Sequence, residues 1–140
     1  MLCIEGTVVV QQRSVLIVDD NADQGRPLAL ILRHSGYEAQ FVTSGEAALT
    51  KVRQEPVGLM IVDMMMPGMS GLDVLRHVRN NPQTQNIPVV IYSACSEERE
   101  MAKARNEGAN DYWVKVSMRL DEICRRIEGF FPTSDPRRPN

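Results

Sequence analysis

Five short apolar segments recur along the chain, and a stretch with helical periodicity follows each of them. The apolar segments are SVLIVDD (14–20), YEAQFV (37–42), VGLMIVD (57–63), IPVVIYSA (87–94) and DYWVKV (111–116). Three of the five are nearly continuous in valine, isoleucine and leucine, which is typical of strands that helices cover on both faces. The mixed polarity of residues 37–42 indicates an edge strand. Strict β-α alternation predicts an α/β fold with a parallel sheet between two helix layers.

The intervening segments predict five helices, at residues 23–36, 44–54, 70–81, 96–109 and 117–131. Ser44 and Ser96 are placed to cap the second and fourth helices, and Gly108 is expected to end the fourth. Pro27 fits the first helix only if it lies in the first turn, where its missing N–H would have no intrahelical partner. Right-handed crossovers then lead to a doubly wound sheet in the order 2-1-3-4-5.

The pattern divides the chain into an N-terminal extension (1–13), one domain (14–131) and a flexible tail (132–140). No apolar run approaches the ~18 residues of a membrane span, and the first residues lack the basic start and apolar stretch of a signal peptide. We therefore expect a cytoplasmic protein that does not bind membranes. The net charge of −2, without a dense Lys/Arg block, argues against direct binding of nucleic acid.

Cysteine and histidine do not suggest a site of their own. The cysteines are three in number and form no C-x-x-C pair, so a disulfide framework or a zinc site is not expected. His34 and His77 both fall within predicted helices rather than at a strand end. A catalytic triad is therefore not expected either.

Polar side chains gather at the predicted carboxyl ends of the strands, which is the edge where ligands bind in such sheets. The first strand ends with Asp19 and Asp20, the third with Asp63 and the fourth with Ser93, while the fifth carries Lys115. Because these strands are neighbours in the predicted order, we expect three carboxylates, one hydroxyl and one ammonium group to share one cleft.

Three carboxylates held close together repel one another, and Lys115 offsets only one charge. Mg²⁺ takes oxygen ligands and suits a site with two carboxylates and a backbone carbonyl. A carboxylate can also act as a nucleophile towards phosphorus, where catalysis depends on positioning and charge neutralisation. Lys115 and Ser93 would then contact two further phosphoryl oxygens. The residues therefore predict formation of a phosphoaspartate at Asp63 with Mg²⁺ as cofactor.

Four segments, VLIVDDN, IVDMMMPGMSG, VVIYSA and GANDYWVK, resemble the signatures of response-regulator receiver domains from bacterial two-component systems. The resemblance covers about residues 13–131. It combines an acid pair, an Asp-x-x-x-Pro-Gly turn, a Ser-Ala step and a late lysine in the same order. It implies a flavodoxin-like fold and a function in phosphorelay signalling, with a sensor histidine kinase or a phosphotransfer protein as phosphate donor.

Carried over position by position, the resemblance makes Asp63 the phosphoacceptor. Asp19 and Asp20 become the acid pair that organises Mg²⁺, and Met65 becomes the residue whose backbone carbonyl completes the protein ligands. The residue-based alternatives are plainer: either acid of the pair could simply cap the following helix. Met64–Met66 are expected to serve in packing rather than as sulfur ligands, because thioethers suit Mg²⁺ poorly.

The resemblance also assigns a switch. Ser93 matches the switch hydroxyl, Lys115 the phosphate-pairing lysine and Tyr112 the aromatic switch, although Tyr112 could also merely pack in the core. Phosphorylation would draw Ser93 towards the phosphoryl group and let Tyr112 turn inward. The surface formed by residues 96–109, 111–116 and 117–131 would then change and bind a downstream protein.

One residue departs from the family pattern. The family usually has proline after the late lysine, joined by a cis peptide bond, and this chain has Val116. A cis bond before valine would cost about 2.5–4 kcal/mol, so we predict a trans bond and a different loop. The reach of Lys115 depends on that loop. Met65 and Cys95 flank the phosphoryl site, and their bulk is expected to slow attack by water.

Two other functions compete with a phosphorylated switch. A pseudo-receiver would bind a partner without being phosphorylated, and Val116 is compatible with that alternative. An enzyme on the same fold is less consistent with the sequence. A flavin-binding protein needs a Ser/Thr/Gly-rich loop where this chain has DDNADQ, and an aspartate-based phosphatase usually carries a second acid where Met65 stands. As a receiver, the chain would catalyse only its own phosphorylation and dephosphorylation. The kinase, the signal, the output and the oligomeric state are not encoded in these motifs.

Overall fold

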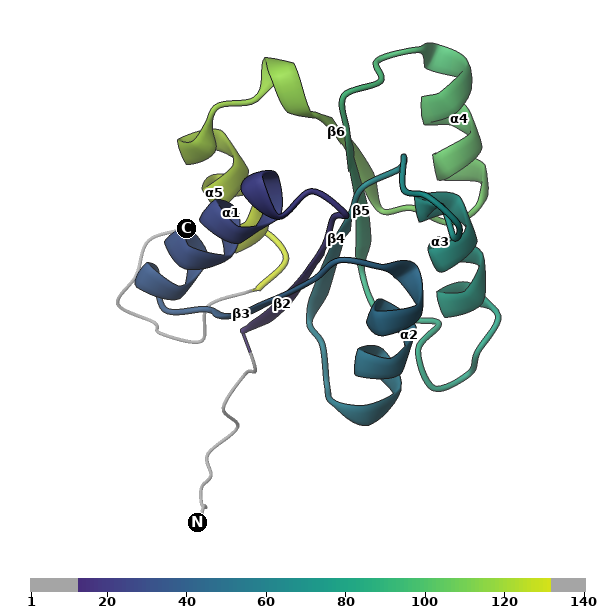
Figure 1. Ribbon diagram of the computed structural model, residues 1–140, viewed down its shortest axis with the longest axis horizontal. Coiled ribbons are helices and arrows are strands. Elements are labelled where there is room, and N and C mark those ends of the chain that lie inside the picture. The colour runs from purple at the N-terminus through teal and green to yellow at the C-terminus, as the bar shows by residue number, and fades with distance from the viewer. Residues whose placement is uncertain (1–12, 132–140) are drawn as a thin grey trace.

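The computed structural model describes residues 13–131 and contains one parallel five-stranded sheet (Figure 1). Its strand order is β3-β2-β4-β5-β6, which is the predicted order 2-1-3-4-5 counted along the described residues. The strands are β2 (Ser14–Val18), β3 (Glu38–Val42), β4 (Leu59–Val62), β5 (Val89–Ser93) and β6 (Asp111–Val114). The predicted extension and tail fall almost wholly outside the described residues and stay predictions.

The burial of the strands follows the expected positions. Every residue of β2 and β4 is buried, as are all but one of β5, because these three strands form the middle of the sheet. β3 lies at one edge and is mostly half-buried, which confirms the edge position predicted from its mixed polarity.

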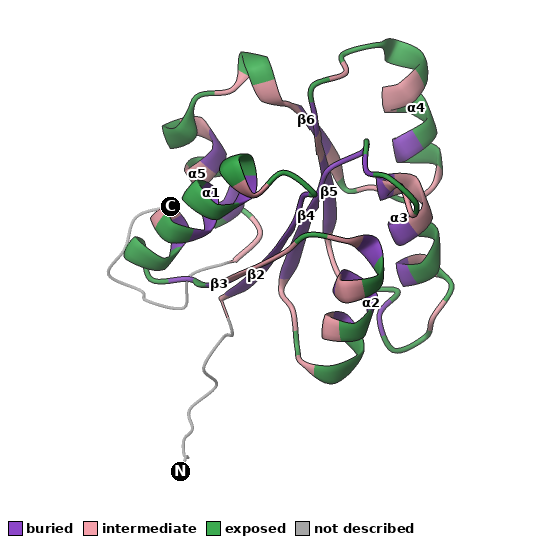
Figure 2. Ribbon diagram, viewed as in Figure 1, coloured by how far each residue is buried: buried purple, intermediate pink, exposed green. Residues whose placement is uncertain are grey.

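Two helix layers cover the sheet. The helices are α1 (Ala22–His34), α2 (Gly45–Gln54), α3 (Gly71–Arg79), α4 (Glu98–Asn106) and α5 (Leu120–Glu128), with a 3-10 turn η1 at Lys115–Ser117. α1 and α5 pack on one face and α2, α3 and α4 on the other, since the buried side chains fall into two matching clusters. Figure 2 shows buried residues along the strands and on the helix faces turned towards them. No helix within residues 13–131 is long and apolar enough to cross a membrane.

The start of α1 differs from the prediction. Pro27 lies in the second turn of the helix, because α1 begins at Ala22. The prediction that it belongs to the first turn was therefore wrong. Its missing N–H would have bonded to the carbonyl of Asp23, and both residues are exposed, so water can reach that carbonyl. The Ser44 cap of α2 is confirmed, since its side chain accepts a hydrogen bond from the Ala47 N–H at 3.1 Å.

The last two helices are shorter than predicted. The N-cap of α4 is Glu97, without a side-chain hydrogen bond, so the predicted Ser96 cap was wrong. Acidic residues in the first turn of α4 offset its helix dipole instead. α4 ends at Asn106, and Gly108 follows with a φ of 104°. α5 begins only at Leu120, because the preceding residues turn through η1.

Candidate functional site

The two central acids stand where neighbouring strands end. Val18 is paired with Val62 in the β2–β4 ladder, and the residue after each of them is an aspartate. The Asp63 N–H donates to the Val18 carbonyl at 2.8 Å, and the Asp19 N–H donates to the Val42 carbonyl at 3.1 Å. Backbone pairing thus continues one residue beyond the strands. It holds both aspartates side by side at the carboxyl edge of the sheet.

Asp19, Asp20 and Asp63 form a compact acidic cluster. Each offers a carboxylate oxygen, and these oxygens lie within 4.8 Å of one another. Asp19 is 3% exposed and Asp63 is 8% exposed, whereas Asp20 is exposed. Asp19 also accepts a hydrogen bond from the Asn21 N–H at 2.9 Å. The N-cap of α1 is Asn21, so the capping role considered for Asp19 and Asp20 is filled by a different residue.

Lys115 reaches into this cluster. Its Nζ lies 2.9 Å from Asp19 Oδ2 and 3.5 Å from Asp63 Oδ2. The prediction that Lys115 approaches Asp63 is thereby confirmed. Its placement on the fifth strand was wrong, because β6 ends at Val114 and Lys115 opens the turn η1. The same Nζ donates to Gln24 Oε1 on α1.

The loop that carries Lys115 departs from the family pattern as expected. Residues 13–131 contain no cis peptide bond, which confirms the trans bond predicted before Val116. The side chain of Val116 is 86% exposed. The turn η1 still brings Lys115 to the acids, so the valine does not prevent the lysine from reaching the cluster.

The pKa of Asp63 is raised above its ordinary value. The main cause is burial, which disfavours the charged form, and the nearby Asp19 carboxylate acts in the same direction. Lys115 and the Met65 N–H, which donates to Asp63 Oδ1 at 3.3 Å, oppose the shift. The single ammonium group therefore does not fully compensate the two buried acids, and a cation bound at this place would favour the ionised form.

The donor set fits Mg²⁺. Three carboxylates in reach of one another supply the hard oxygen ligands that this ion prefers, and the exposed Asp20 leaves a side open to water. The Met65 carbonyl as a further ligand stays a prediction. Of the three methionines after Asp63, Met64 and Met66 pack in the hydrophobic core, whereas Met65 is 70% exposed.

Two glycines shape the loop after Asp63, and they do so in different ways. Gly68 has a φ of 76°, the left-handed region that glycine adopts most readily. At Gly71 the requirement is space, because a Cβ there would lie 2.4 Å from the Asp63 carbonyl oxygen. The Gly71 N–H donates to the Met64 carbonyl at 3.0 Å. The first turn of α3 is thus drawn against the backbone that carries Asp63.

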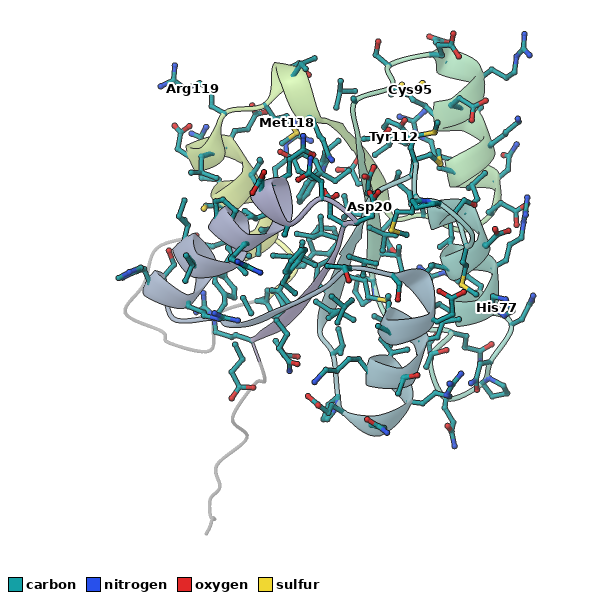
Figure 3. The ribbon with its side chains drawn as sticks, viewed as in Figure 1. Asp20, His77, Cys95, Tyr112, Met118 and Arg119 are labelled. Carbon is teal, nitrogen blue, oxygen red and sulfur yellow. The ribbon has the colours of Figure 1, made fainter. Side chains whose placement is uncertain are left out.

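Both candidate switch residues are hydrogen-bonded to the backbone of Cys95, and Figure 3 labels one of them, Tyr112, together with Cys95. Ser93 ends β5 and is fully buried, and its Oγ accepts a hydrogen bond from the Cys95 N–H at 3.1 Å. The Tyr112 hydroxyl donates to the Cys95 carbonyl at 2.7 Å, and Tyr112 is 5% exposed. Tyr112 therefore already points inward, while the next residue, Trp113, packs in the core on the opposite face of the sheet.

Sequence reasoning found the acids, the lysine and the hydroxyl but missed two contributors. Gln24 carries no motif signal, because its role depends on a contact with Lys115, a residue 91 positions away. The role of Cys95 as a backbone bridge is also invisible, since any residue has the N–H and the carbonyl that Ser93 and Tyr112 use. Only the tertiary structure could identify either one.

Comparison with known proteins agrees with this geometry. The model of the response regulator receiver domain matches residues 15–128. The sensory transduction protein RegX3 of Mycobacterium tuberculosis is 38% identical over 112 residues, which are 80% of this chain and 48% of that protein. The DNA-binding response regulator MtrA of Mycobacterium leprae is 33% identical over 124 residues, covering 89% of this chain and 53% of that protein. The chain thus spans about half the length of these relatives.

Solved structures show the same fold. The chemotaxis protein CheY4 of Vibrio cholerae superposes with a TM-score of 0.80 at 22% identity. The superposition covers 86% of this chain and 100% of CheY4. A putative response regulator from Chloroflexus aurantiacus has a TM-score of 0.79 at 30% identity, covering 86% of this chain and 98% of that one. Together with the family model and the site at the strand ends, these likenesses place the chain in a family. It belongs to the response regulator receiver domains.

Proposed function

We propose that this receiver domain is a switch controlled by phosphorylation of Asp63, with a sensor histidine kinase or a phosphotransfer protein as donor. The observation that carries the proposal is the contact between two buried acids and the half-buried ammonium group of Lys115. Lys115 Nζ lies 3.5 Å from Asp63 Oδ2 and 2.9 Å from Asp19 Oδ2. A structural ion pair would need only one acid, and a third carboxylate, Asp20, lies in reach of both.

The chemistry follows from these groups. A carboxylate oxygen of Asp63 attacks the phosphorus of the donor, an oxygen–phosphorus bond forms, and the bond from phosphorus to the donor nitrogen breaks. The electron pair of that bond leaves with the donor histidine. Lys115 offsets charge on the phosphoryl oxygens, and Asp19 holds Lys115 in place. Mg²⁺ bound by Asp19, Asp20 and Asp63 would supply further neutralisation of the phosphoryl charge.

The switch would act through Ser93. Its hydroxyl now accepts from the Cys95 N–H, and moving towards a phosphoryl group would exchange that bond for a new one. Because the Tyr112 hydroxyl is bonded to the Cys95 carbonyl, a shift of this residue would reach Tyr112 directly. The surface formed by α4, β6 and α5 is proposed to change in response and to bind a downstream protein.

The first test is intact-mass analysis after incubation with acetyl phosphate and Mg²⁺. We expect a gain of one phosphoryl group in the natural chain, and none with EDTA or in an Asp63→Asn variant. No gain in protein shown to be folded would contradict the proposal and favour a phosphorylation-independent pseudo-receiver. Val116→Pro would then be the first substitution to make, since Val116 is the departure from the family pattern.

We further propose that the domain works in the cytoplasm and binds neither membrane nor nucleic acid directly. The net charge of −2 supports the second point, because binding to phosphate backbones requires clustered lysine and arginine. MtrA is named as a DNA-binding protein, but the region that matches this chain makes up only 53% of MtrA. The test is a fluorescence titration with duplex DNA at low salt, for both the phosphorylated and the unphosphorylated chain. Saturable binding would contradict the proposal that the domain does not bind nucleic acid directly.

A further inference from the structure

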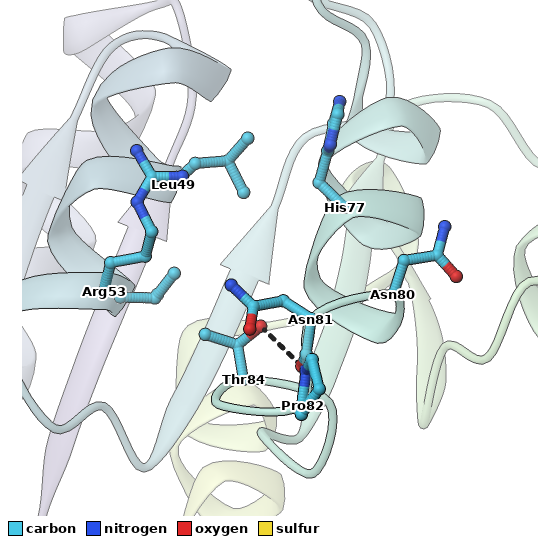
Figure 4. Close-up of a pocket in the computed structure, with 8 residues that line it drawn as sticks. Leu49, Arg53, His77, Asn80, Asn81, Pro82 and Thr84 are labelled. Carbon is cyan, nitrogen blue, oxygen red and sulfur yellow. Dashed lines mark hydrogen bonds between the residues drawn. The ribbon is translucent and has the colours of Figure 1, made fainter.

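A cavity of about 340 Å³ lies between α2 and α3 (Figure 4), and none of the three clustered aspartates lines it. It is lined by the last turns of these helices and by the loop that leads into β5. In a parallel α/β fold the helices run back along the sheet, so their last turns lie at the edge where the strands begin. Asp63 stands at the opposite edge. The cavity is therefore separate from the site described above.

An arginine and a histidine side chain line this cavity from its two helices. Arg53 comes from α2 and His77 from α3, and no acidic residue lines the cavity. Within residues 13–131 neither of them takes part in an ion pair, whereas Lys51 on α2 is paired with Glu55 at 3.0 Å. Basic residues in the last turn of a helix favour its dipole. The helix dipole explains why Arg53 and His77 occur in the last turns of their helices. It does not explain why both line the same cavity, in which no carboxylate is present.

The rest of the lining is suited to an apolar group with an amide next to it. Leu49 and Val52 form the floor of the cavity, and Pro82 lines the loop side. Asn81 adds one side-chain amide, whereas the Asn80 side chain points away from α2 in Figure 4. The Asn81 oxygen already accepts the N–H of the residue two positions on, at 2.9 Å, which leaves its NH₂ group as a donor.

We propose that this cavity binds the free carboxyl terminus of a partner polypeptide whose last residue is branched and apolar. Arg53 and His77 would bind the carboxylate, Leu49 and Val52 would contact the side chain, and the Asn81 amide would donate to the carbonyl of the last peptide group. The volume lies at the small end of the range for ligand pockets, about 300–1,000 Å³, as a single terminal residue requires. This inference does not depend on phosphorylation of Asp63.

The experiment is a titration of the full ¹⁵N-labelled chain with N-acetyl-leucine, followed by ¹H–¹⁵N spectra. We expect saturable shifts confined to the backbone amides of residues 49–53, 77–81, 83 and 84. Arg53→Gln should weaken binding about tenfold, because a charge-assisted hydrogen bond is lost. His77→Gln should also weaken it. Arg26→Gln on α1 is the matched control, since Arg26 is exposed and lies on the other face of the sheet, and it should leave the affinity unchanged.

Two further probes separate the possible ligands. N-acetyl-leucinamide lacks the charge and should not bind, whereas 4-methylpentanoate keeps the charge and the branched group but lacks the amide and should bind more weakly. Equal binding of 4-methylpentanoate would assign the cavity to free carboxylic acids and overturn the polypeptide source. Shifts that do not saturate, shifts that leucinamide reproduces, or full affinity in Arg53→Gln would overturn the site itself.

Discussion

At the scale of single residues, the function proposed for this domain depends on a carboxyl group kept in an unfavourable environment. Asp63 is 8% exposed, lies beside a second buried acid and has a raised pKa. An acid whose pKa is higher in the folded than in the unfolded chain destabilises the fold increasingly as the pH rises from the unfolded to the folded pKa, and fully above it. The cost is absent below the ordinary value of 3.8. The buried position of Asp63 therefore costs stability at neutral pH.

Asp63→Asn is therefore expected to raise the free energy of unfolding at pH 7 in EDTA. The amide removes the buried charge, while Lys115 keeps its closer partner, Asp19. The gain should shrink as the pH falls and vanish well below 3.8, where Asp63 of the natural chain is protonated in both states. Urea unfolding at pH 7 and below pH 3 measures both points. A variant that is less stable at pH 7 would show that burial is not the dominant influence on Asp63.

Gly71→Ala is expected to cost about 2–3 kcal/mol of stability, because the added Cβ would meet backbone atoms that cannot move aside cheaply. The nearest are the Asp63 carbonyl oxygen at 2.4 Å and Met64 Cα at 2.8 Å. Gly36→Ala is the control: no atom lies within 4 Å there, and only its φ of 95° is strained, at about 1 kcal/mol. Equal losses in urea unfolding would contradict the steric argument.

Met65→Asn is expected to shorten the lifetime of the phosphorylated state. The Met65 N–H donates to Asp63 Oδ1 at 3.3 Å, and Met65 is 70% exposed. An amide there can orient water, whereas the thioether can only obstruct it. The measurement is loss of phosphoryl mass over time after removal of acetyl phosphate, with Met69→Asn as a control in the same loop. A variant that loses phosphate no faster than the natural chain would contradict the role.

At the scale of secondary structure elements, the helix ends are held by side chains that cross between loops. Arg79, the last residue of α3, is the clearest case. Its guanidinium donates to the carbonyls of Gly108 at 3.0 Å, Gln85 at 3.0 Å and Ile87 at 2.7 Å, and to Asn110 Oδ1 at 2.8 Å. One side chain thereby joins the end of α3 to the loop before β5 and to the loop between α4 and β6.

Arg79→Lys is expected to cost about 2 kcal/mol, because an ammonium group cannot reproduce the forked geometry and several acceptors lose their donor. Arg76→Lys, one turn earlier, is the matched control. Its ion pairs with Asp73 and Glu107 are largely solvated, so the change should stay within about 0.5 kcal/mol. Urea unfolding of both variants tests this. Similar losses would mean that Arg79 acts only as a surface charge.

At the scale of the whole molecule, the sheet separates two chemically different edges. The carboxyl edge gathers the acids, which suit a cation, and the edge where the strands begin bears the cavity with Arg53 and His77, which suits an anion. A parallel sheet produces this separation, because the carboxyl ends of all its strands lie at one edge and their amino ends at the other. Each edge can therefore be occupied without blocking the other.

Mg²⁺ is expected to stabilise the whole fold, because the unfolded chain does not hold the three acids together. At ten times its dissociation constant the gain would be about 1.4 kcal/mol. Potassium chloride of equal ionic strength should not reproduce it, and Asp19→Asn should remove most of it. Urea unfolding with and without Mg²⁺ is the measurement. An equal gain in Asp19→Asn would place the ion elsewhere on the protein.

The amino-acid sequence by itself determined the strand order, the edge position of β3 and the residues that end the central strands. Apolar periodicity reports how each segment is buried, and strict alternation with right-handed crossovers leaves few arrangements of the strands. The same local information predicted the Ser44 cap and the trans bond at Val116, because capping and peptide geometry depend on immediate neighbours.

Only the tertiary structure decided how the site is assembled. Lys115 lies in a 3-10 turn, bonded to Gln24 and Asp19, and these partners are 91 and 96 positions away. The close approach of Gly71 to the Asp63 carbonyl and the convergence of α2 and α3 on one cavity are likewise products of packing. Periodicity describes the average environment of an element. It does not record which side chains meet when distant elements pack together.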